Sequence, residues 1–157
     1  MRFAGFAVLF LALAACVSAH SQTPPAPVRD AALAQRLGAD ERGMRQYILV
    51  ILRTGPYVTQ SDEERARLFE GHFANINRLA EQGKLLVAGP IDQNDHNYRG
   101  IFVFNVATIA EAQALVANDP TVTSGIFSPE YYEWYASAAL VELPDIHRRI
   151  APAASDH

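Results

Sequence analysis

The sequence predicts an α+β protein of the ferredoxin-like class, in which an antiparallel sheet carries helices on one face in the order β-α-β-β-α-β. Two observations lead to this prediction. Residues 47–52 form an apolar, partly β-branched run that stops at Gly55-Pro56, as a strand would. Ser61 and Thr108 each precede a glutamate by three residues, which is the pattern of a capped helix N-terminus.

The first half of the pattern consists of a strand, a helix and a second strand. Ser61 and Glu64 form an expected capping box, so the helix should run from 62 to about 82 and stop at Gly83. The apolar residues 85–88 then form a strand that ends at Gly89-Pro90.

The second half repeats the pattern in the order strand, helix, strand. A polar loop leads to a third strand over residues 101–106, and Thr108 with Glu111 caps the next helix. That helix should end by Asn118, because Pro120 disfavours helical geometry at Asp119. A loop or helical turn precedes the fourth strand, predicted over residues 131–135.

The strands are apolar on both faces, whereas helices would cover only one of them. Residues 47–52 are apolar without alternation, and so are residues 101–104. A second copy packed sheet to sheet would cover the open face, which favours a homodimer. The alternative is that the N-terminal helix or the C-terminal tail covers it.

The N-terminus has the form of an export signal over residues 1–19. Arg2 precedes an apolar run that is too short to span a bilayer, and small residues follow. Two processing sites compete. A lipobox would end at Cys16, the only cysteine, and make it the lipidated first residue; ordinary cleavage would follow Ala19. We therefore expect an exported, periplasmic protein, either anchored to the membrane through lipidated Cys16 or soluble.

Three further segments complete the predicted organisation. Residues 20–44 are expected to form a Pro-rich tether and a short helix that Asp30 caps and Gly38 ends. Residues 45–140 form the folded domain. Residues 141–157 are expected to be a loosely held tail.

Composition and motifs exclude several function classes. A formal net charge of −4 without a basic cluster argues against nucleic acid as the partner. Phosphate-loop, dinucleotide-binding, serine-hydrolase and zinc-protease motifs are all missing. The loop 92–96 holds oxygen ligands and His96 but lacks the spacing of a calcium site. We expect no metal and no organic cofactor.

His72 lies on the apolar stripe of the first predicted domain helix. A histidine at such a position is more often structural than catalytic. Asp119 is the candidate partner, because this topology brings the ends of both helices to one side of the sheet. A carboxylate beside an imidazole fixes its tautomer and favours its protonated form, which suits acid–base catalysis. The alternative is that Asp119 only forms a turn before Pro120.

An ordered set of short motifs resembles the YciI-like (YCII-related) proteins. The set comprises His72, Gly83-Lys84-Leu85-Leu86, Ala88-Gly89-Pro90, Tyr98-Arg99-Gly100, Asp119-Pro120 and Gly125-Ile126-Phe127. The resemblance implies a dimeric α+β barrel and a His–Asp pair in a pocket, carried here by His72 and Asp119. At least one related activity is the cofactor-free dehydrochlorination of a chlorinated hydroxyquinol.

Further residues are candidates for binding a substrate. Gly89 and Pro90 would shape the floor of a pocket, and Arg99 would suit a carboxylate or phenolate, although Tyr98 and Arg99 also fit a surface hairpin. The aromatic residues of 131–135 fit a core or a dimer interface. Thr121 replaces the aromatic or bulky residue usual in the YciI-like pattern.

Three functions are consistent with the sequence. The first is an enzyme of lyase or isomerase type that acts on a small organic molecule, with His72 as the proton carrier. The second is an exported module that binds a small molecule without turning it over. The third is a structural partner at the cell envelope.

Overall fold

The computed structural model describes residues 28–151. The predicted export signal over residues 1–19, including Cys16, and the tether up to residue 27 lie outside the described residues. So do the last residues of the chain, 152–157.

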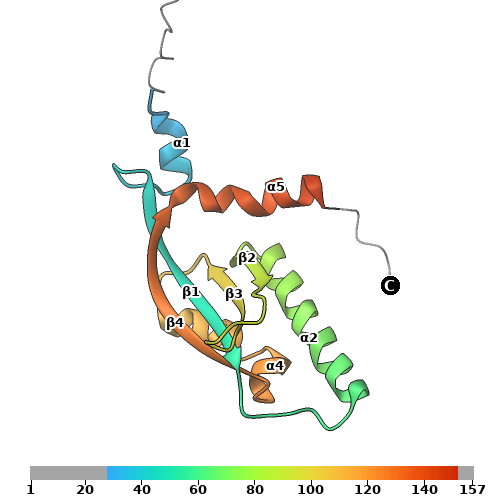
Figure 1. The fold of residues 1–157 in the computed structure, drawn as a ribbon. Coiled ribbons are helices and arrows are strands. Elements are labelled where there is room, and N and C mark those ends of the chain that lie inside the picture. Colours follow the sequence, from blue (N-terminus) through green and yellow to red (C-terminus); the bar gives the residue numbers. More distant parts are fainter. Residues whose placement is uncertain (1–27, 152–157) are drawn as a thin grey trace, which may run out of the picture.

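Four strands form one antiparallel sheet (Figure 1). They are β1 (Met44–Thr54), β2 (Leu85–Pro90), β3 (Tyr98–Phe104) and β4 (Phe127–Ser137). Their order across the sheet is β2-β3-β1-β4, which is the arrangement of a ferredoxin-like fold. The predicted fold class is confirmed. Each strand is longer than the sequence pattern indicated, and β3 also begins and ends earlier than predicted.

The helices connect and flank the strands. They are α1 (Ala31–Arg36), α2 (Asp62–Glu81), α3 (Ile109–Val116), α4 (Pro120–Thr123), the 3₁₀ helix η1 (Ala138–Glu142) and α5 (Leu143–Ile150). The short turn expected after Asp119 is therefore the helix α4. None of the helices within residues 28–151 combines the length and hydropathy needed to cross a bilayer.

The main hydrophobic core lies between the sheet and the helices α2 and α3. Val50 pairs with Phe102 and Ile48 with Phe104, so these side chains share one face of the sheet. Leu79 of α2 packs against the same cluster, as do Ala112 and Val116 of α3. Both helices therefore cover the same face, as predicted.

A second apolar cluster lies on the opposite face, which the strands predicted to be apolar as well. Tyr47, Leu86, Val103 and Ala136 form it, and Leu140 and Val141 pack against them. Figure 1 shows α5 lying across one end of the sheet. The prediction of a loosely held tail is wrong for residues 141–151, because Val141 packs against the second apolar cluster and the segment continues as the helix α5.

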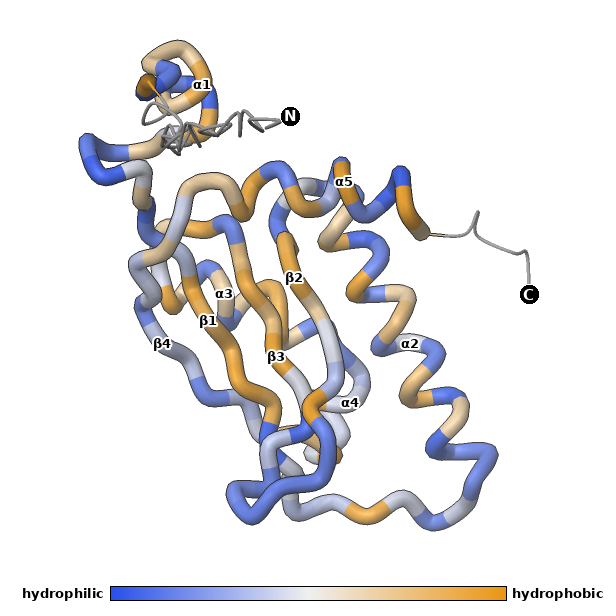
Figure 2. Tube along the Cα trace, turned by 45° about the horizontal axis from the view of Figure 1, so that its top comes forward, coloured by the Kyte–Doolittle hydropathy of each residue, from blue (hydrophilic) through white to orange (hydrophobic). Residues whose placement is uncertain are grey.

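The rest of the open face carries apolar and aromatic side chains with partial exposure. Figure 2 shows β1 and β3 as hydrophobic strands in the middle of this sheet. Leu49, Ile51 and Ile101 are half-buried, while Tyr132 and Trp134 on β4 are 45% and 36% exposed. Tyr47 itself is fully buried and lies 6.3 Å from the ring of Trp134.

The caps of the helices agree with the sequence in all but one respect. Asp30 accepts from the amide of Leu33, and Thr108 and Glu111 form a complete capping box. The hydroxyl of Ser61 caps α2 through the amide of Glu64. The carboxylate of Glu64, however, does not return to Ser61.

Glu64 instead bonds the residues before the helix. It accepts from the Tyr57 hydroxyl at 2.6 Å and from the Gln60 amide at 2.7 Å. The predicted capping box at α2 is thus only half formed, because these two donors compete successfully for the carboxylate.

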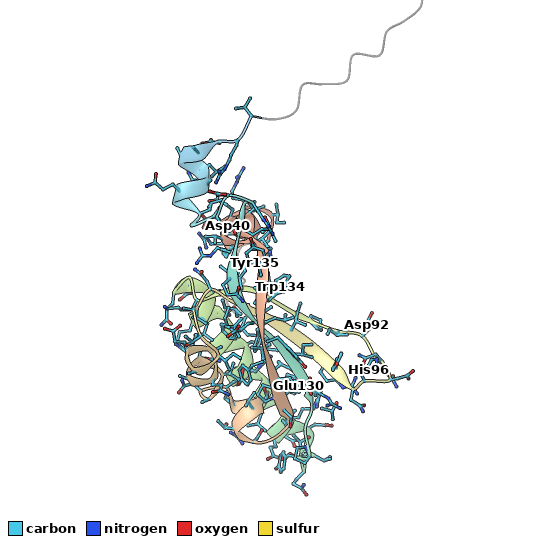
Figure 3. The ribbon with its side chains drawn as sticks, turned by 90° about the vertical axis from the view of Figure 1, so that its left-hand side faces the viewer. Asp40, Asp92, His96, Glu130, Trp134 and Tyr135 are labelled. Carbon is cyan, nitrogen blue, oxygen red and sulfur yellow. The ribbon has the colours of Figure 1, made fainter. Side chains whose placement is uncertain are left out.

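Two side-chain contacts tie the ends of β4 to neighbouring elements (Figure 3). The Tyr135 hydroxyl donates to Asp40, next to α1, at one end of the strand. At the other end, Arg53 of β1 and Glu130 form an ion pair at 2.9 Å. They add to the backbone pairing that holds β4 beside β1, at the edge of the sheet.

Candidate functional site

The buried side of helix α2 contains two polar residues. Leu68, His72, Asn75 and Leu79 occupy this side, spaced by three or four residues as the helix period requires. His72 and Asn75 are each only 7% exposed. Buried polar groups need hydrogen-bond partners, so both residues require acceptors or donors from another element.

Asp119 supplies these partners from the N-terminus of α4. It is the N-cap residue of α4, with extended backbone and a side chain that accepts from the amide of Thr121. Its side chain is fully buried. Asp119 therefore caps a helix where the sequence predicted at most a turn before Pro120, and its carboxylate points into the protein.

A close approach between α2 and α4 brings the two residues together. A Cβ atom on Gly71 would lie 2.7 Å from Cγ of Pro120, a distance that side chains do not tolerate. Only glycine at position 71 lets α4 lie this close to α2.

The pair that results is a short, buried, charge-assisted hydrogen bond. Nδ1 of His72 lies 2.7 Å from Oδ2 of Asp119. The structure thus brings together the two residues that the sequence suggested as partners.

The carboxylate of Asp119 has a donor on each side. Oδ1 accepts from the Thr121 amide at 3.0 Å and from the Thr121 hydroxyl at 2.7 Å. Oδ2 accepts from His72 and, at a longer 3.5 Å, from the amide nitrogen of Asn75. Burial would raise the pKa of Asp119, but the hydrogen bonds from His72 and Thr121 outweigh it and hold the pKa below its usual value.

An ionised Asp119 determines the tautomer of His72. A carboxylate oxygen can only accept, so the ring proton resides on Nδ1. The Thr121 hydroxyl oxygen, 3.2 Å from Nδ1, lies beside the same proton. Nε2 is then the nitrogen that can accept a proton from another molecule.

The second ring nitrogen of His72, Nε2, makes no hydrogen bond within residues 28–151, because both hydrogen bonds of the ring use Nδ1. His72 as a whole is 7% exposed, so a small part of the residue reaches the surface.

Aromatic rings surround the imidazole. The ring centroids of Phe69, Phe73, Phe102 and Phe127 lie between 5.5 and 5.9 Å from that of His72. Phe73, the nearest of them, is 57% exposed.

The other predicted site residues lie apart from the pair. Gly89 and Pro90 belong to β2, where Pro90 pairs with Gly100 and Gly89 with Ile101. Pro90 is tolerated within this strand because β2 is at the edge of the sheet. Nothing lies within 4 Å of a Cβ placed on Gly89, so no close packing in this protomer requires a glycine there.

Arg99 lies near the start of β3, where the pairing with β1 shifts: Leu52 pairs with Gly100, the next residue Arg53 pairs with Tyr98, and Arg99 is the extra residue between them. Its guanidinium donates to Thr54 Oγ1 at 2.7 Å, to the carbonyl of Tyr98 and to Asn97 Oδ1. Within one protomer the structure does not bring Arg99 to His72. Its role in binding stays a prediction.

The loop 92–96 is organised by Asn94. The Asn94 amide donates to the carbonyls of Asp92 and Tyr98, and its oxygen accepts from the amides of His96 and Tyr98. Figure 3 shows Asp92 and His96 in this loop, at the far end of the β2–β3 hairpin. Across residues 28–151 no three His, Cys, Asp or Glu side chains gather as ligands for a metal ion.

Two residues contact the pair without having been predicted to do so. Thr121, where the sequence departs from the YciI-like pattern, is fully buried and donates twice to Asp119. Asn75 lies three residues after His72, on the same side of the helix. The sequence does contain a sign of this role: Asn75 is a second polar residue on the predicted buried face of the helix, and such a residue needs a hydrogen-bond partner.

The fold and this site define an α+β protein with a buried His–Asp pair between helix and sheet. The model of the YCII-related domain matches residues 47–135, which is more than half of the chain and includes both members of the pair. The chain belongs to the YCII-related domain family.

No curated protein matches the chain. Among solved structures, the chain is similar to 5-chloro-2-hydroxyhydroquinone dehydrochlorinase from Burkholderia phenoliruptrix AC1100, in complex with 2,5-dihydroxybenzoquinone. The two chains are 22% identical with a TM-score of 0.40, and the similarity covers 55% of this chain and 92% of the other.

Proposed function

We propose that this YCII-related protein catalyses cofactor-free acid–base chemistry, of lyase or isomerase type, on a small organic molecule. Nε2 of His72 accepts or donates the proton, and Asp119 orients the imidazole and balances its charge when it is protonated. The observation that carries this proposal is the 2.7 Å hydrogen bond from Nδ1 to the buried carboxylate. It leaves Nε2 as the free nitrogen of a ring with a fixed tautomer.

The surroundings of Nε2 indicate what kind of molecule would bind. Four phenylalanine rings surround the imidazole, so an apolar or ring-shaped molecule is better suited to the site than a sugar or a peptide. A phenol, a lactone or a hydroxy acid combines such a body with a proton that a base can remove.

The test is a ligand-induced melting shift across small phenols, lactones and hydroxy acids, on the wild type and on His72→Gln in parallel. A ligand that binds only the folded state stabilises it by about 2.7 kcal/mol at a hundredfold excess over its dissociation constant. The proposal expects at least one compound that raises the melting temperature of the wild type and not of the variant. A screen without such a compound, in which His72→Gln is less stable than the wild type, would favour a structural role.

One observation supports a non-catalytic alternative. The His72 side chain is only 8% exposed, and both oxygens of Asp119 are engaged by neighbouring donors. A pair of this kind can hold α2 and α4 together in a protein that binds a small molecule without turning it over, or in a structural partner at the cell envelope. A compound that binds at His72 and is recovered unchanged after long incubation would favour this binding module.

We also propose that a second copy covers the part of the sheet that η1 and α5 leave free. Half-buried Leu49, Ile51 and Ile101 and the exposed rings of Tyr132 and Trp134 form that surface. Two such sheets packed face to face would bury it and form a dimeric α+β barrel. Sedimentation equilibrium of the wild type and of Trp134→Glu tests this, since a monomeric wild type would contradict it.

Export is the remaining part of the proposal. Cys16 and the apolar run before it favour a lipoprotein held at the membrane, and cleavage after Ala19 would give a soluble periplasmic protein instead. Lipoprotein processing is blocked by globomycin, whereas ordinary cleavage is not. Accumulation of the unprocessed chain in the presence of globomycin would therefore support the first route.

A further inference from the structure

A surface hollow of about 410 Å³ lies close to Asp119, since the chain neighbours Asn118 and Pro120 both line it. It is bounded by α2 and by the junction between α3 and α4, and its lining residues are Gly71, Ala74, Asn75, Arg78, Asn118 and Pro120. Figure 1 shows α2 and α4 beside each other at this place. His72 does not line the hollow, so the space is separate from the aromatic surroundings of Nε2.

The hollow carries one positive charge and no negative one. Arg78 is its only charged lining residue. The Arg78 guanidinium donates to two neutral oxygens, Oδ1 of Asn75 at 2.6 Å and Oε1 of Gln82 at 3.3 Å. Within residues 28–151 the ion pairs involve other residues, so no described carboxylate neutralises Arg78.

Two amide groups in the lining still have donors to offer. Asn75 uses one N–H toward Asp119, and Asn118 uses one toward the carbonyl of Ala114 at 3.0 Å. A side-chain amide carries two N–H donors, so each of these residues retains one. Gly71, Ala74 and Pro120 are small and apolar, and they leave the polar side of the hollow accessible.

We propose that this hollow binds a small oxyanion, a phosphate or a carboxylate, through Arg78, Asn75 and Asn118. A guanidinium presents a planar fork of donors that matches two oxygens of a phosphate or carboxylate, and such charge-assisted bonds are the stronger ones. An anion at Arg78 competes with Oδ1 of Asn75 for the guanidinium. Asn75 also contacts Asp119, so the side chain of Asn75 connects the bound anion with the His72–Asp119 pair.

This site does not depend on the proposed chemistry at His72. His72 and the phenylalanines around it do not line the hollow, and binding at Arg78 is measured without any substrate. A failure of one proposal is therefore distinguishable from a failure of the other.

The test is an NMR titration of the full chain with inorganic phosphate, and separately with acetate, at constant ionic strength. The side-chain resonances of Arg78, Asn75 and Asn118 should shift and saturate along one binding curve. Arg78→Gln should weaken that binding by about tenfold, the effect of losing one charged donor. The matched control is Arg42→Gln, which removes the same charge from an exposed turn before β1 and should change the affinity by less than about twofold.

Several results would overturn the proposal. The wild type would show no saturable shift at these three side chains, or Arg78→Gln would bind as well as the wild type. Equal weakening by Arg42→Gln would mean that the anion responds only to net charge. Because the Arg78 side chain is exposed, the variant is expected to stay folded, and its melting temperature checks this.

Discussion

Nδ1 of His72 and Oδ2 of Asp119 lie 2.7 Å apart in the folded chain, although 47 residues separate them in the sequence. One belongs to the middle of a long helix and the other caps a helix of a single turn. Their contact depends on the close packing of α2 against α4 and on the donors that hold the carboxylate in place. Each of these conditions leads to a prediction.

The first prediction concerns the acid side of the stability profile. The pKa of Asp119 is lowered in the folded state, so its contribution to stability is present above the pKa of the unfolded chain, about 3.9, and is lost as pH falls through the lower folded value. Asp119→Asn should be less stable than the wild type at pH 7, by about 1–3 kcal/mol, and should lose less stability between pH 5 and pH 2. Urea unfolding across this pH range measures both effects.

Asp95→Asn is the control for that experiment, because Asp95 is an exposed acid in the β2–β3 loop. Its profile should follow that of the wild type. If Asp119→Asn keeps the full acid-side loss of the wild type, the carboxylate does not carry the contribution assigned to it.

The second prediction concerns the Thr121 hydroxyl. Thr121→Val keeps the shape of the side chain and removes a donor to Oδ1 of Asp119, which should destabilise the protein by about 1–2 kcal/mol at pH 7. Losing that donor also raises the pKa of Asp119 toward its usual value, so stability should begin to fall at a higher pH than in the wild type.

Thr121→Ser separates these two effects. It deletes a buried methyl group and keeps the hydroxyl, so it should lower stability without moving the pH at which stability is lost. A shift of that pH in Thr121→Ser, or none in Thr121→Val, would show that the hydroxyl does not determine the ionisation of Asp119.

The third prediction concerns the contact between α2 and α4. Gly71→Ala places a methyl group 2.7 Å from Cγ of Pro120, and relieving this clash should cost about 1–3 kcal/mol. Gly89→Ala, for which nothing lies within 4 Å, is the matched control with a small effect. Chemical denaturation measures the free energy of unfolding of both variants. Equal values for Gly71→Ala and Gly89→Ala would mean that α4 is free to move away from α2.

The fourth prediction concerns the segment that follows β4. Leu140 packs against the second apolar cluster, so Leu140→Ala should destabilise the protein by about 2–3 kcal/mol. Ile150→Ala in α5 should change stability by less than about 0.5 kcal/mol, because Ile150 is 76% exposed. The same small effect for both variants in thermal unfolding would indicate that this segment is not part of the folded core.

Much of the fold could be predicted from local sequence patterns, because the observed strands and helices follow those patterns. The strand at 47–52 and the helix from Asp62 have the periodicities of their elements, and Gly83 takes the positive φ of 65° that ends α2. The helix α5 lies in the segment that the sequence predicts to be a loosely held tail, and it contains Pro144. Proline is tolerated in the first turn of a helix, where α5 places it.

The site could be predicted in outline but not in its supporting contacts. His72 and Asp119 carry chemistry that is visible in the sequence, and the topology brings their helices together. The contact between Asn75 and Asp119 depends on the exact rotation of α2, which short motifs do not determine. Glu64 likewise bonds Tyr57 and Gln60 because the preceding loop folds back, a choice that a capping pattern alone cannot reveal.

The most direct test of the central claim, that His72 transfers a proton, uses a compound that binds at this residue. Its exchange or elimination is followed by NMR in D₂O with the wild type, His72→Gln and Arg42→Gln. Proton transfer by a positioned side chain contributes roughly 10²–10⁴-fold, so His72→Gln should lose activity on that scale while Arg42→Gln retains it. An unchanged rate in His72→Gln, with the compound still bound, would contradict the account.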